Sequence, residues 1–260
     1  MSLSIDQAIR TAAQAASEAA DILAEGFMSP DKQPASKGHP NDRVTVYDRM
    51  AEKAIVETIM TMHPNDGILS EESVQSAGTS GRRWIVDPLD GTNNFISGIP
   101  HFAVSIALAI EDQSVLGCVC DPIRGEIFTA IRSKGAYLNG LPIGVSHRQT
   151  LEGAVLGIGL SYDPARRIRM IARLQPLLAS AGVLRTLGSA ALDLAYVAAG
   201  RLDAVWYLAL SPWDVAAAML LVEEAGGAVT GLQGTALRDP EQGVAASNGH
   251  IHDRFLHALL

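Results

Sequence analysis

The sequence predicts a layered α+β or mixed α/β protein with a boundary near residue 150. Two patterns of helical periodicity open the chain, β-rich runs separated by turn residues follow, and strands alternate with helices after residue 151. Elements in this order pack as layers of helix and sheet. A chain of 260 residues can bury one large core, so we expect a single domain, 1–260, with two lobes, 1–150 and 151–260.

The first lobe is predicted to begin with two helices. Apolar residues recur at helical spacing over residues 5–27, and a second such pattern covers residues 50–62. The segment between them, residues 29–41, contains three prolines and is predicted to be a loop. The run Gly67–Ser70 predicts a strand, and Trp84-Ile85-Val86 is typical of the end of another buried strand.

The remaining elements are predicted from apolar runs and turn residues. Residues 102–110, 114–121 and 126–131 are β-rich runs divided by turn residues, which predicts an antiparallel meander. Strand and helix patterns then alternate over residues 154–159, 165–179, 183–187, 190–199, 203–208, 212–225, 228–230, 244–247 and 251–259.

The composition narrows the classes of function. Apolar residues make up 48% and charged residues 18%, as in ordinary packed soluble proteins. The net charge of -8 argues against direct nucleic-acid binding, which needs clustered Lys and Arg. No apolar run approaches the roughly 20 residues of a membrane span, and the first ten residues lack a signal-peptide pattern. The only cysteines, Cys118 and Cys120, are expected to be reduced core thiols of a cytoplasmic protein.

The most informative segment follows the Trp84 strand. This buried strand leads directly into Asp87-Pro88-Leu89-Asp90, which we expect to form a turn. Two carboxylates at a strand end stabilise a fold poorly but can hold divalent cations, although a purely structural pair is the alternative. Neither Cys nor His accompanies them, and oxygen ligands suit Mg²⁺ or Mn²⁺ rather than Zn²⁺.

Three further acidic positions lie at the ends of predicted elements. Asp48 precedes the second helix, Glu71 follows a strand with Glu72 beside it, and Asp214 begins a later helix. Each has a structural alternative. Asp48 would be a solvated carboxylate, the two glutamates would be loop charge, and Asp214 would complete a Ser-x-x-Asp capping box with Ser211. Together with the first pair, these residues form a candidate site for two or more cations.

A phosphate-binding turn is predicted beside the two aspartates. Gly91-Thr92-Asn93 would begin a short helix, whose free backbone N–H groups can receive a phosphate oxygen. The Thr92 hydroxyl can hold and polarise a water molecule. Carboxylates for several cations beside such a turn are the components of metal-assisted phosphate ester hydrolysis.

Four motifs resemble those of the inositol monophosphatase family, within the lithium-sensitive, magnesium-dependent phosphatase superfamily. They are Val44-Thr45-x-x-Asp48, Glu71-Glu72-Ser73, Asp87-Pro88-Leu89-Asp90-Gly91-Thr92-x-Asn94-Phe95, and Trp213-Asp214-Val215-Ala216 followed by Glu224-Ala225-Gly226-Gly227. The motifs arrive in family order and cover nearly the whole chain. The resemblance implies an α+β fold, a layered αβαβα sandwich of the inositol monophosphatase and fructose-1,6-bisphosphatase type, usually assembled as a homodimer.

The resemblance also implies which residues bind metal. Glu71, Asp87 and the backbone carbonyl of Leu89 would bind a first Mg²⁺ ion. Asp87, Asp90 and Asp214 would bind a second, and Glu71 with water molecules would help to hold a third, looser one. Two to three Mg²⁺ ions, or Mn²⁺ in their place, are therefore expected.

The same resemblance implies the catalytic and phosphate-binding groups. Thr92, oriented by Asp48, and Glu71 would position the water that attacks phosphorus in line. The metals would lower the pKa of that water and receive the charge of the departing alkoxide. The N–H groups of Gly91 and Thr92 would hold the phosphate, and Lys37 lies where the family places a lysine over the site.

The alcohol side of the site departs from the family pattern. Gly188-Ser189-Ala190 resembles the segment that contacts the alcohol, but Tyr207 replaces an acidic residue that holds inositol hydroxyls. A tyrosine donates one hydrogen bond and cannot accept as a carboxylate does. The resemblance therefore implies a small polyol or sugar phosphate resembling inositol 1-phosphate, with histidinol phosphate, fructose bisphosphate or a nucleotide phosphate as alternatives.

Two classes of function follow. The first is an inositol-monophosphatase-like phosphoric monoester hydrolase that acts on a small-molecule ester, requires Mg²⁺ and is sensitive to lithium. The alternative is a regulatory, antitermination-type protein that retains the phosphatase fold and works through protein contacts, as some similar bacterial proteins do. Intact metal-ligand positions favour the first class and leave a dual role open.

Overall fold

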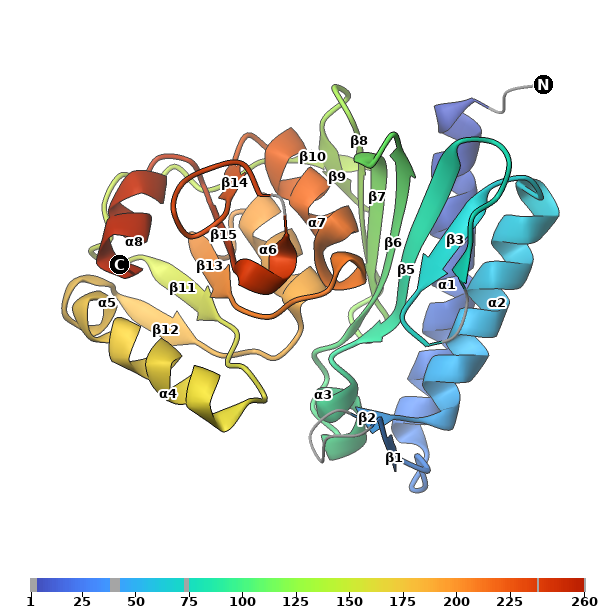
Figure 1. The fold of residues 1–260 in the computed structure, drawn as a ribbon, viewed down its shortest axis with the longest axis horizontal. Coiled ribbons are helices and arrows are strands. Elements are labelled where there is room, and N and C mark those ends of the chain that lie inside the picture. Colours follow the sequence, from blue (N-terminus) through green and yellow to red (C-terminus); the bar gives the residue numbers. More distant parts are fainter. Residues whose placement is uncertain (1–3, 38–42, 73–74, 238, 260) are drawn as a thin grey trace.

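The computed structural model describes residues 4–37, 43–72, 75–237 and 239–259, which form alternating layers of helix and sheet (Figure 1). Helices α1, Ile5–Met28, and α2, Val46–Met62, cover one face of an eight-stranded sheet. Small apolar residues of α1 make this contact close, because the helix buries alanines along one face. These two helices and the sheet enclose the first part of the core.

The eight-stranded sheet contains the predicted meander. Its order is β10-β9-β8-β7-β6-β5-β3-β4, with β3 parallel to β5 and the other neighbours antiparallel. The strands are β3 (Gly67–Ser70), β4 (Gln75–Ser76), β5 (Arg82–Asp90), β6 (Ala103–Ile110), β7 (Gln113–Asp121), β8 (Glu126–Ile131), β9 (Ala136–Leu138) and β10 (Leu141–Ile143). Cys118 and Cys120 on β7 are free and buried, as expected.

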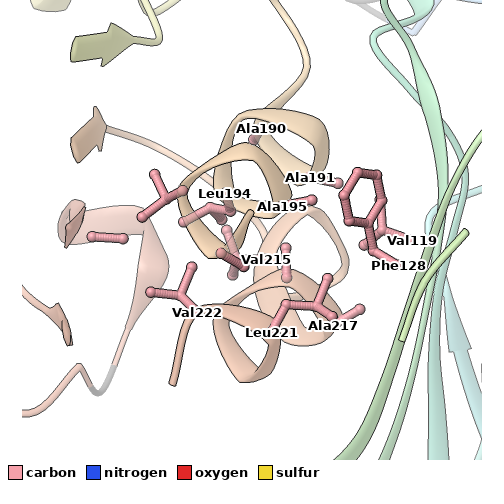
Figure 2. Packing of buried hydrophobic residues seen from close by; sticks show 14 of the residues in the cluster. Val119, Phe128, Ala190, Ala191, Leu194, Ala195, Val215, Ala217, Leu221 and Val222 are labelled. Atoms are coloured by element: carbon pink, nitrogen blue, oxygen red, sulfur yellow. The ribbon is translucent and has the colours of Figure 1, made fainter. Parts of the chain in front are cut away.

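Two helices form the central layer between this sheet and a second one. These are α6, Ala190–Ala198, and α7, Pro212–Glu224. Figure 2 shows Val119 and Phe128 of the large sheet facing alanine and leucine side chains of these helices. Both helices are apolar around much of their circumference, which is typical of helices buried on two sides.

The second sheet has five strands in the order β12-β11-β13-β15-β14. Strand β11 is parallel to both of its neighbours, and β15 is antiparallel to both of its own. The strands are β11 (Val155–Ile158), β12 (Val183–Arg185), β13 (Ala204–Tyr207), β14 (Ala228–Thr230) and β15 (Val244–Ser247). Its outer face is covered by three helices, α4 (Pro164–Arg173), α5 (Gln175–Ser180) and α8 (His252–Leu259). The αβαβα order confirms the predicted fold class.

Two helix predictions were wrong in their boundaries, and one hairpin was missed. Helix α2 begins at Val46 rather than at residue 50, because Thr45 caps it and Asp48 completes a capping box. The single helix predicted over residues 165–179 is divided into α4 and α5 at Leu174, two residues before Pro176, which has no backbone N–H. The β9–β10 hairpin was not predicted.

The remaining short elements surround the site described below. Helix α3, Thr92–Ser97, begins as predicted. Strand β1, Ala35–Ser36, pairs with β2, Arg43–Val44, so the loop predicted over residues 29–41 was wrong at β1. A 3₁₀ turn covers Pro240–Gln242. Ser73 of the second motif lies outside the described residues. Within the described ranges, no helix is long and apolar enough to cross a membrane.

Candidate active site

A cavity of about 550 Å³ contains most of the predicted site. It is lined by eleven predicted site residues, namely Lys37, Glu71, Asp87, Leu89, Asp90, Gly91, Thr92, Gly188, Ala190, Tyr207 and Asp214. The other two, Asp48 and Ser189, lie behind its wall. Asp48 accepts a hydrogen bond from Thr92 over 3.2 Å, and Ser189 donates one to Asp90 over 2.5 Å.

Asp87 and Asp90 belong to strand β5, which corrects the expected turn. On a regular strand, residues three apart point to opposite faces. The pairing with β6 shifts between them, since Asp87 pairs with Ser105 and Asp90 with Ala103, which marks a β-bulge. The extra residue restores both carboxylates to one face, and Pro88 is tolerated because a bulge leaves a position unpaired. The bulge therefore lets both aspartates reach the cavity.

Three of the acidic side chains lie at helix N-termini. Asp48 accepts hydrogen bonds from the Thr45 N–H and hydroxyl over 2.8 and 2.6 Å at the start of α2. Asp214 accepts from the Ser211 N–H over 2.7 Å in the capping box of α7. Asp90 accepts from the Ala191 N–H over 2.7 Å at the start of α6. The positive ends of three helices thus partly offset the clustered negative charge.

Burial and contacts decide between the structural and functional alternatives for the three further acidic positions. Asp48 is fully buried, so the solvated carboxylate was wrong. Asp214 does cap α7, but it also lines the cavity, so the cap does not exclude a second role. Glu71 and Glu72 are not loose loop charges, because Lys37 forms ion pairs with both, at 2.8 Å to the Glu71 carboxylate.

The carboxylates carry more negative charge than their surroundings neutralise. Burial, together with repulsion from Glu71, Asp90 and Asp214, raises the pKa of Asp87 well above its ordinary value. Burial and the Asp90 charge raise the pKa of Asp214 in the same direction. Burial raises the pKa of Asp90 to about 6, although the Ser189 hydrogen bond opposes the change. A group that is this costly to ionise is typical of a site that receives a cation.

Burial also changes the groups next to these carboxylates. It raises the pKa of Asp48 to about 6 and that of Glu72 to about 7, against the opposing effect of their hydrogen bonds. Burial lowers the pKa of Lys37, but the Glu71 and Glu72 carboxylates outweigh it and raise that pKa above its usual range. Lys37 therefore stays charged at the edge of the cavity.

The donor set fits a hard divalent cation. In the described part of the chain, no three His, Cys, Asp or Glu side chains form a ready-made metal cluster. The carboxylates instead accept nearby hydrogen bonds, and Asp87 accepts from the Leu89 N–H over 3.0 Å. Four carboxylates and a backbone carbonyl around one cavity nevertheless offer only oxygen ligands, which Mg²⁺ prefers. Their raised pKa values reflect a charge that such an ion would neutralise.

Thr92 lies between the acidic groups and the start of α3. Its hydroxyl is 3.2 Å from Asp48 Oδ1 and 3.0 Å from the Leu89 carbonyl oxygen, and its single proton goes to one of these acceptors. The oxygen lone pairs remain free to accept from a water molecule. Gly91 precedes it with φ of 94°, a left-handed conformation that favours glycine and turns the chain into the helix.

Apolar side chains form another part of the cavity lining. Ends of β11 and β13 supply Ile158, Leu160, Leu208 and Leu210, and Trp213 comes from the first turn of α7. Tyr162 also lines the cavity, and its hydroxyl accepts a hydrogen bond from the Asn93 amide over 2.9 Å.

Several residues of the site were missed in the sequence. Arg43 and Tyr162 also line the cavity, and Asp193 and His101 lie behind Tyr207. Asp193 gave no signal, because an acidic residue in the first turn of a helix is ordinary. The Thr45-x-x-Asp48 spacing did carry a signal, since it is a capping box and could have fixed the start of α2.

Comparison with known proteins identifies the family. The model of the inositol monophosphatase family matches residues 4–260. The protein named Nus factor SuhB of Salmonella typhimurium is 43% identical over 225 residues, 86% of this chain and 84% of that protein. The inositol-1-monophosphatase of Rhizobium meliloti is 40% identical over 240 residues, 92% and 90% of the two chains.

A solved structure agrees with these sequence relatives. The crystal structure of the extragenic suppressor protein suhB from Bartonella henselae has a TM-score of 0.94 and 41% sequence identity, covering 97% of this chain and 98% of that one. The Thermotoga maritima IMPase has a TM-score of 0.88 at 34% identity and covers 98% of this chain and 96% of its own. With its αβαβα fold and its motifs in register, the chain belongs to the inositol monophosphatase family.

Proposed function

We propose that this protein is a Mg²⁺-dependent phosphomonoesterase that hydrolyses a small polyol or sugar phosphate. The observation that carries the proposal is the convergence of Glu71, Asp87, Asp90 and Asp214 on one cavity beside the Thr92 hydroxyl. The inositol-1-monophosphatase of Rhizobium meliloti, which is 40% identical, supports a polyol ester as substrate.

The predicted metal ligands would hold Mg²⁺ at the acidic wall of this cavity. When bound there, the ion would act as a Lewis acid, lowering the pKa of a water molecule and offsetting the charge of the leaving group. Glu71, Asp87, Asp90, Asp214 and the Leu89 carbonyl are the groups that would hold it. Burial and the neighbouring carboxylates raise the pKa of Asp87, and a divalent cation would relieve the repulsion among these groups.

The residues beside the metal ligands would orient the reactants. Asp48 accepts a hydrogen bond from the Thr92 hydroxyl, so the lone pairs of that hydroxyl oxygen would accept a hydrogen bond from the attacking water. Glu71, fixed by its ion pair with Lys37, would accept the second hydrogen bond of that water. The backbone N–H groups of Gly91 and Thr92 would hold the phosphate oxygens, because they have no partner within α3.

Phosphate release from a panel of inositol, sugar, histidinol and nucleotide phosphates tests this function. We expect Mg²⁺-dependent release from at least one polyol or sugar phosphate and its loss in Asp90→Asn. The matched control is Asp112→Asn, since the Asp112 side chain is 95% exposed and far from the cavity residues. Absence of release from every ester, or full activity in Asp90→Asn, would contradict the proposal.

A second function is favoured by several of the relatives. Proteins named Nus factor SuhB, including those of Salmonella typhimurium and Escherichia coli at 43% and 42% identity, match most of this chain. A regulatory, antitermination-type role through protein contacts is therefore the alternative, and the same fold can carry both roles. Recovery of transcription machinery in a pull-down, unchanged by Asp90→Asn, would support it. A pull-down that recovers no such proteins would count against the regulatory role and leave the phosphatase function as the remaining proposal.

A further inference from the structure

We propose that Tyr207 is a positioning residue that fixes the Asp90 carboxylate through the first turn of α6, and that it does not bind the substrate alcohol. The inference rests on the proposed phosphatase function and assigns a different task to the residue that replaces the family's acidic side chain. Three sets of contacts carry it.

The first observation is the inaccessibility of the Tyr207 side chain. Only 6% of the residue is exposed, although it lines the cavity. Its ring lies directly over the Gly159 backbone, because a Cβ atom added at Gly159 would come within 1.8 Å of the ring atoms Cδ1 and Cε1. A substrate in the cavity can therefore meet one small part of the ring at most.

The second observation is the direction of the Tyr207 hydroxyl. It donates a hydrogen bond of 2.5 Å to Asp193 Oδ2 and lies 3.4 Å from the Ser189 carbonyl oxygen. Asp193 is fully buried, and its other oxygen is 3.2 Å from His101 Nε2. The hydroxyl is thus engaged with a buried carboxylate, and exchanging this partner for a substrate hydroxyl would leave Asp193 without its shortest hydrogen bond.

The third observation connects α6 with the metal-binding wall. Ser189 caps this helix, and its hydroxyl donates to Asp90 Oδ2 over 2.5 Å. The Ala191 N–H donates to the same oxygen over 2.7 Å. Both donors belong to the turn that contains Asp193, so the Tyr207 contact and the Asp90 contacts are made by one rigid unit.

The remainder of α6 is held by core packing rather than by hydrogen bonds to the site. Figure 2 shows Ala191, Leu194 and Ala195 of α6 packed in the central core layer. Small side chains in close packing fix the position of the helix as a whole, but they provide no hydrogen bond at its N-terminus. Tyr207 supplies this second restraint from β13. Partners behind a metal ligand set its orientation and affect metal affinity.

The test is Mg²⁺ titration by calorimetry of metal-free wild type and Tyr207→Phe, followed by steady-state kinetics on two esters that differ in hydroxyl number. We expect Tyr207→Phe to bind Mg²⁺ roughly three- to tenfold more weakly. We expect kcat to fall at a fixed Mg²⁺ concentration, while the ratio of the KM values of the two esters stays unchanged. The control is Tyr137→Phe, whose hydroxyl donates to the Lys134 carbonyl on the β9 edge, away from the cavity.

A double variant tests the route through Ser189. Ser189→Ala should itself weaken Mg²⁺ binding about tenfold or more. If Tyr207 acts through this turn, Tyr207→Phe should add little in the Ser189→Ala background. Full additivity would show that the two residues act separately and would overturn the inference.

Other outcomes also decide between the two roles. Unchanged Mg²⁺ affinity with a KM that rises for the ester with more hydroxyls would show that Tyr207 binds the alcohol. Should Tyr207→Phe fail to fold, Asp193→Asn alters the same contact with nearly the same shape and is expected to weaken Mg²⁺ binding. If the wild type binds Mg²⁺ but cleaves no ester, the proposed phosphatase function fails, while the Mg²⁺ affinities of the variants still test the role of Tyr207. If the wild type binds no Mg²⁺, both the proposed function and the role of Tyr207 are overturned.

Discussion

Replacement of Asp90 by asparagine should stabilise the metal-free protein at pH 8, although it removes a proposed metal ligand. Asp90 is half-buried beside other acidic groups, and this burial raises the pKa of its carboxyl to about 6 from the ordinary value of 3.8. Asparagine has nearly the same shape and keeps an oxygen that can accept from Ser189 and Ala191. The substitution therefore removes the cost of the charge and retains most of the contacts.

The sign and size of the effect follow from the pKa values. The folded state binds the Asp90 proton more tightly than the unfolded chain does. The stabilisation that this protonated carboxyl contributes is therefore fully present below pH 3.8 and is lost as pH rises through about 6. A difference of about two pH units corresponds to about 3 kcal/mol at pH 8. Because Asp90 is partly exposed and screened by solvent, we expect a gain of about 1–2 kcal/mol for the variant.

Urea unfolding of chelator-treated protein at pH 4.5 and pH 8 measures this gain. The difference between variant and wild type should be small at pH 4.5 and largest at pH 8, whereas Asp112→Asn should show no such trend. Added Mg²⁺ should reverse the order at pH 8, because the wild type gains more binding energy from the ions than a variant that lacks one ligand of the second ion. A variant less stable than wild type at pH 8 without metal, or an equal gain at both pH values, would refute the electrostatic reasoning.

Three further outcomes are expected. Thr92→Ala should lower kcat by about 10²- to 10⁴-fold, because this hydroxyl is proposed to orient the attacking water. The Mg²⁺ affinity measured by calorimetry should stay close to that of the wild type. An equal loss of kcat and of Mg²⁺ affinity would contradict this role. Gly159→Ala should lower the free energy of unfolding by about 1–3 kcal/mol, because the new methyl group would overlap the Tyr207 ring. Thermal melts measure this loss. An unchanged melting temperature would show that the ring can move. Mg²⁺ binding should release protons from carboxylates with raised pKa values, so the affinity for Mg²⁺ should increase from pH 5.5 to pH 7.5. Calorimetry in buffers of different ionisation enthalpy measures the released protons. An Mg²⁺ affinity that does not change with pH would contradict this expectation.

Local patterns in the sequence were enough to predict most of the fold. The helical periodicity of residues 5–27 and the turn residues of the meander depend on neighbours along the chain, and both matched the structure. The β9–β10 hairpin also had a local signal, the dipeptide Asn139-Gly140, whose two residues both have positive φ as a tight hairpin turn requires. That hairpin could have been predicted and was not.

The positions of the site residues could be predicted, but their contacts could not. Carboxylates at element ends identified Asp87, Asp90 and Asp214 as members of one cavity. The bulge that turns two of them to the same face depends on pairing with β6, which the sequence of β5 does not contain. The pairing of Asp90 with Ser189 joins residues 99 positions apart, and that of Tyr207 with Asp193 depends on the packing of α6 against β13. Such contacts follow from tertiary structure alone.

The site is complete only where three helix N-termini meet at this cavity. Asp48, Asp90 and Asp214 are held by the first turns of α2, α6 and α7; α2 belongs to an outer layer and the other two to the central layer, and the three helices come from both halves of the chain. A partly folded chain would contain the same carboxylates without their common orientation, and its affinity for divalent ions would be correspondingly weak. Tight Mg²⁺ binding would therefore report that all the layers have assembled, and the ion would favour the completed fold over every intermediate.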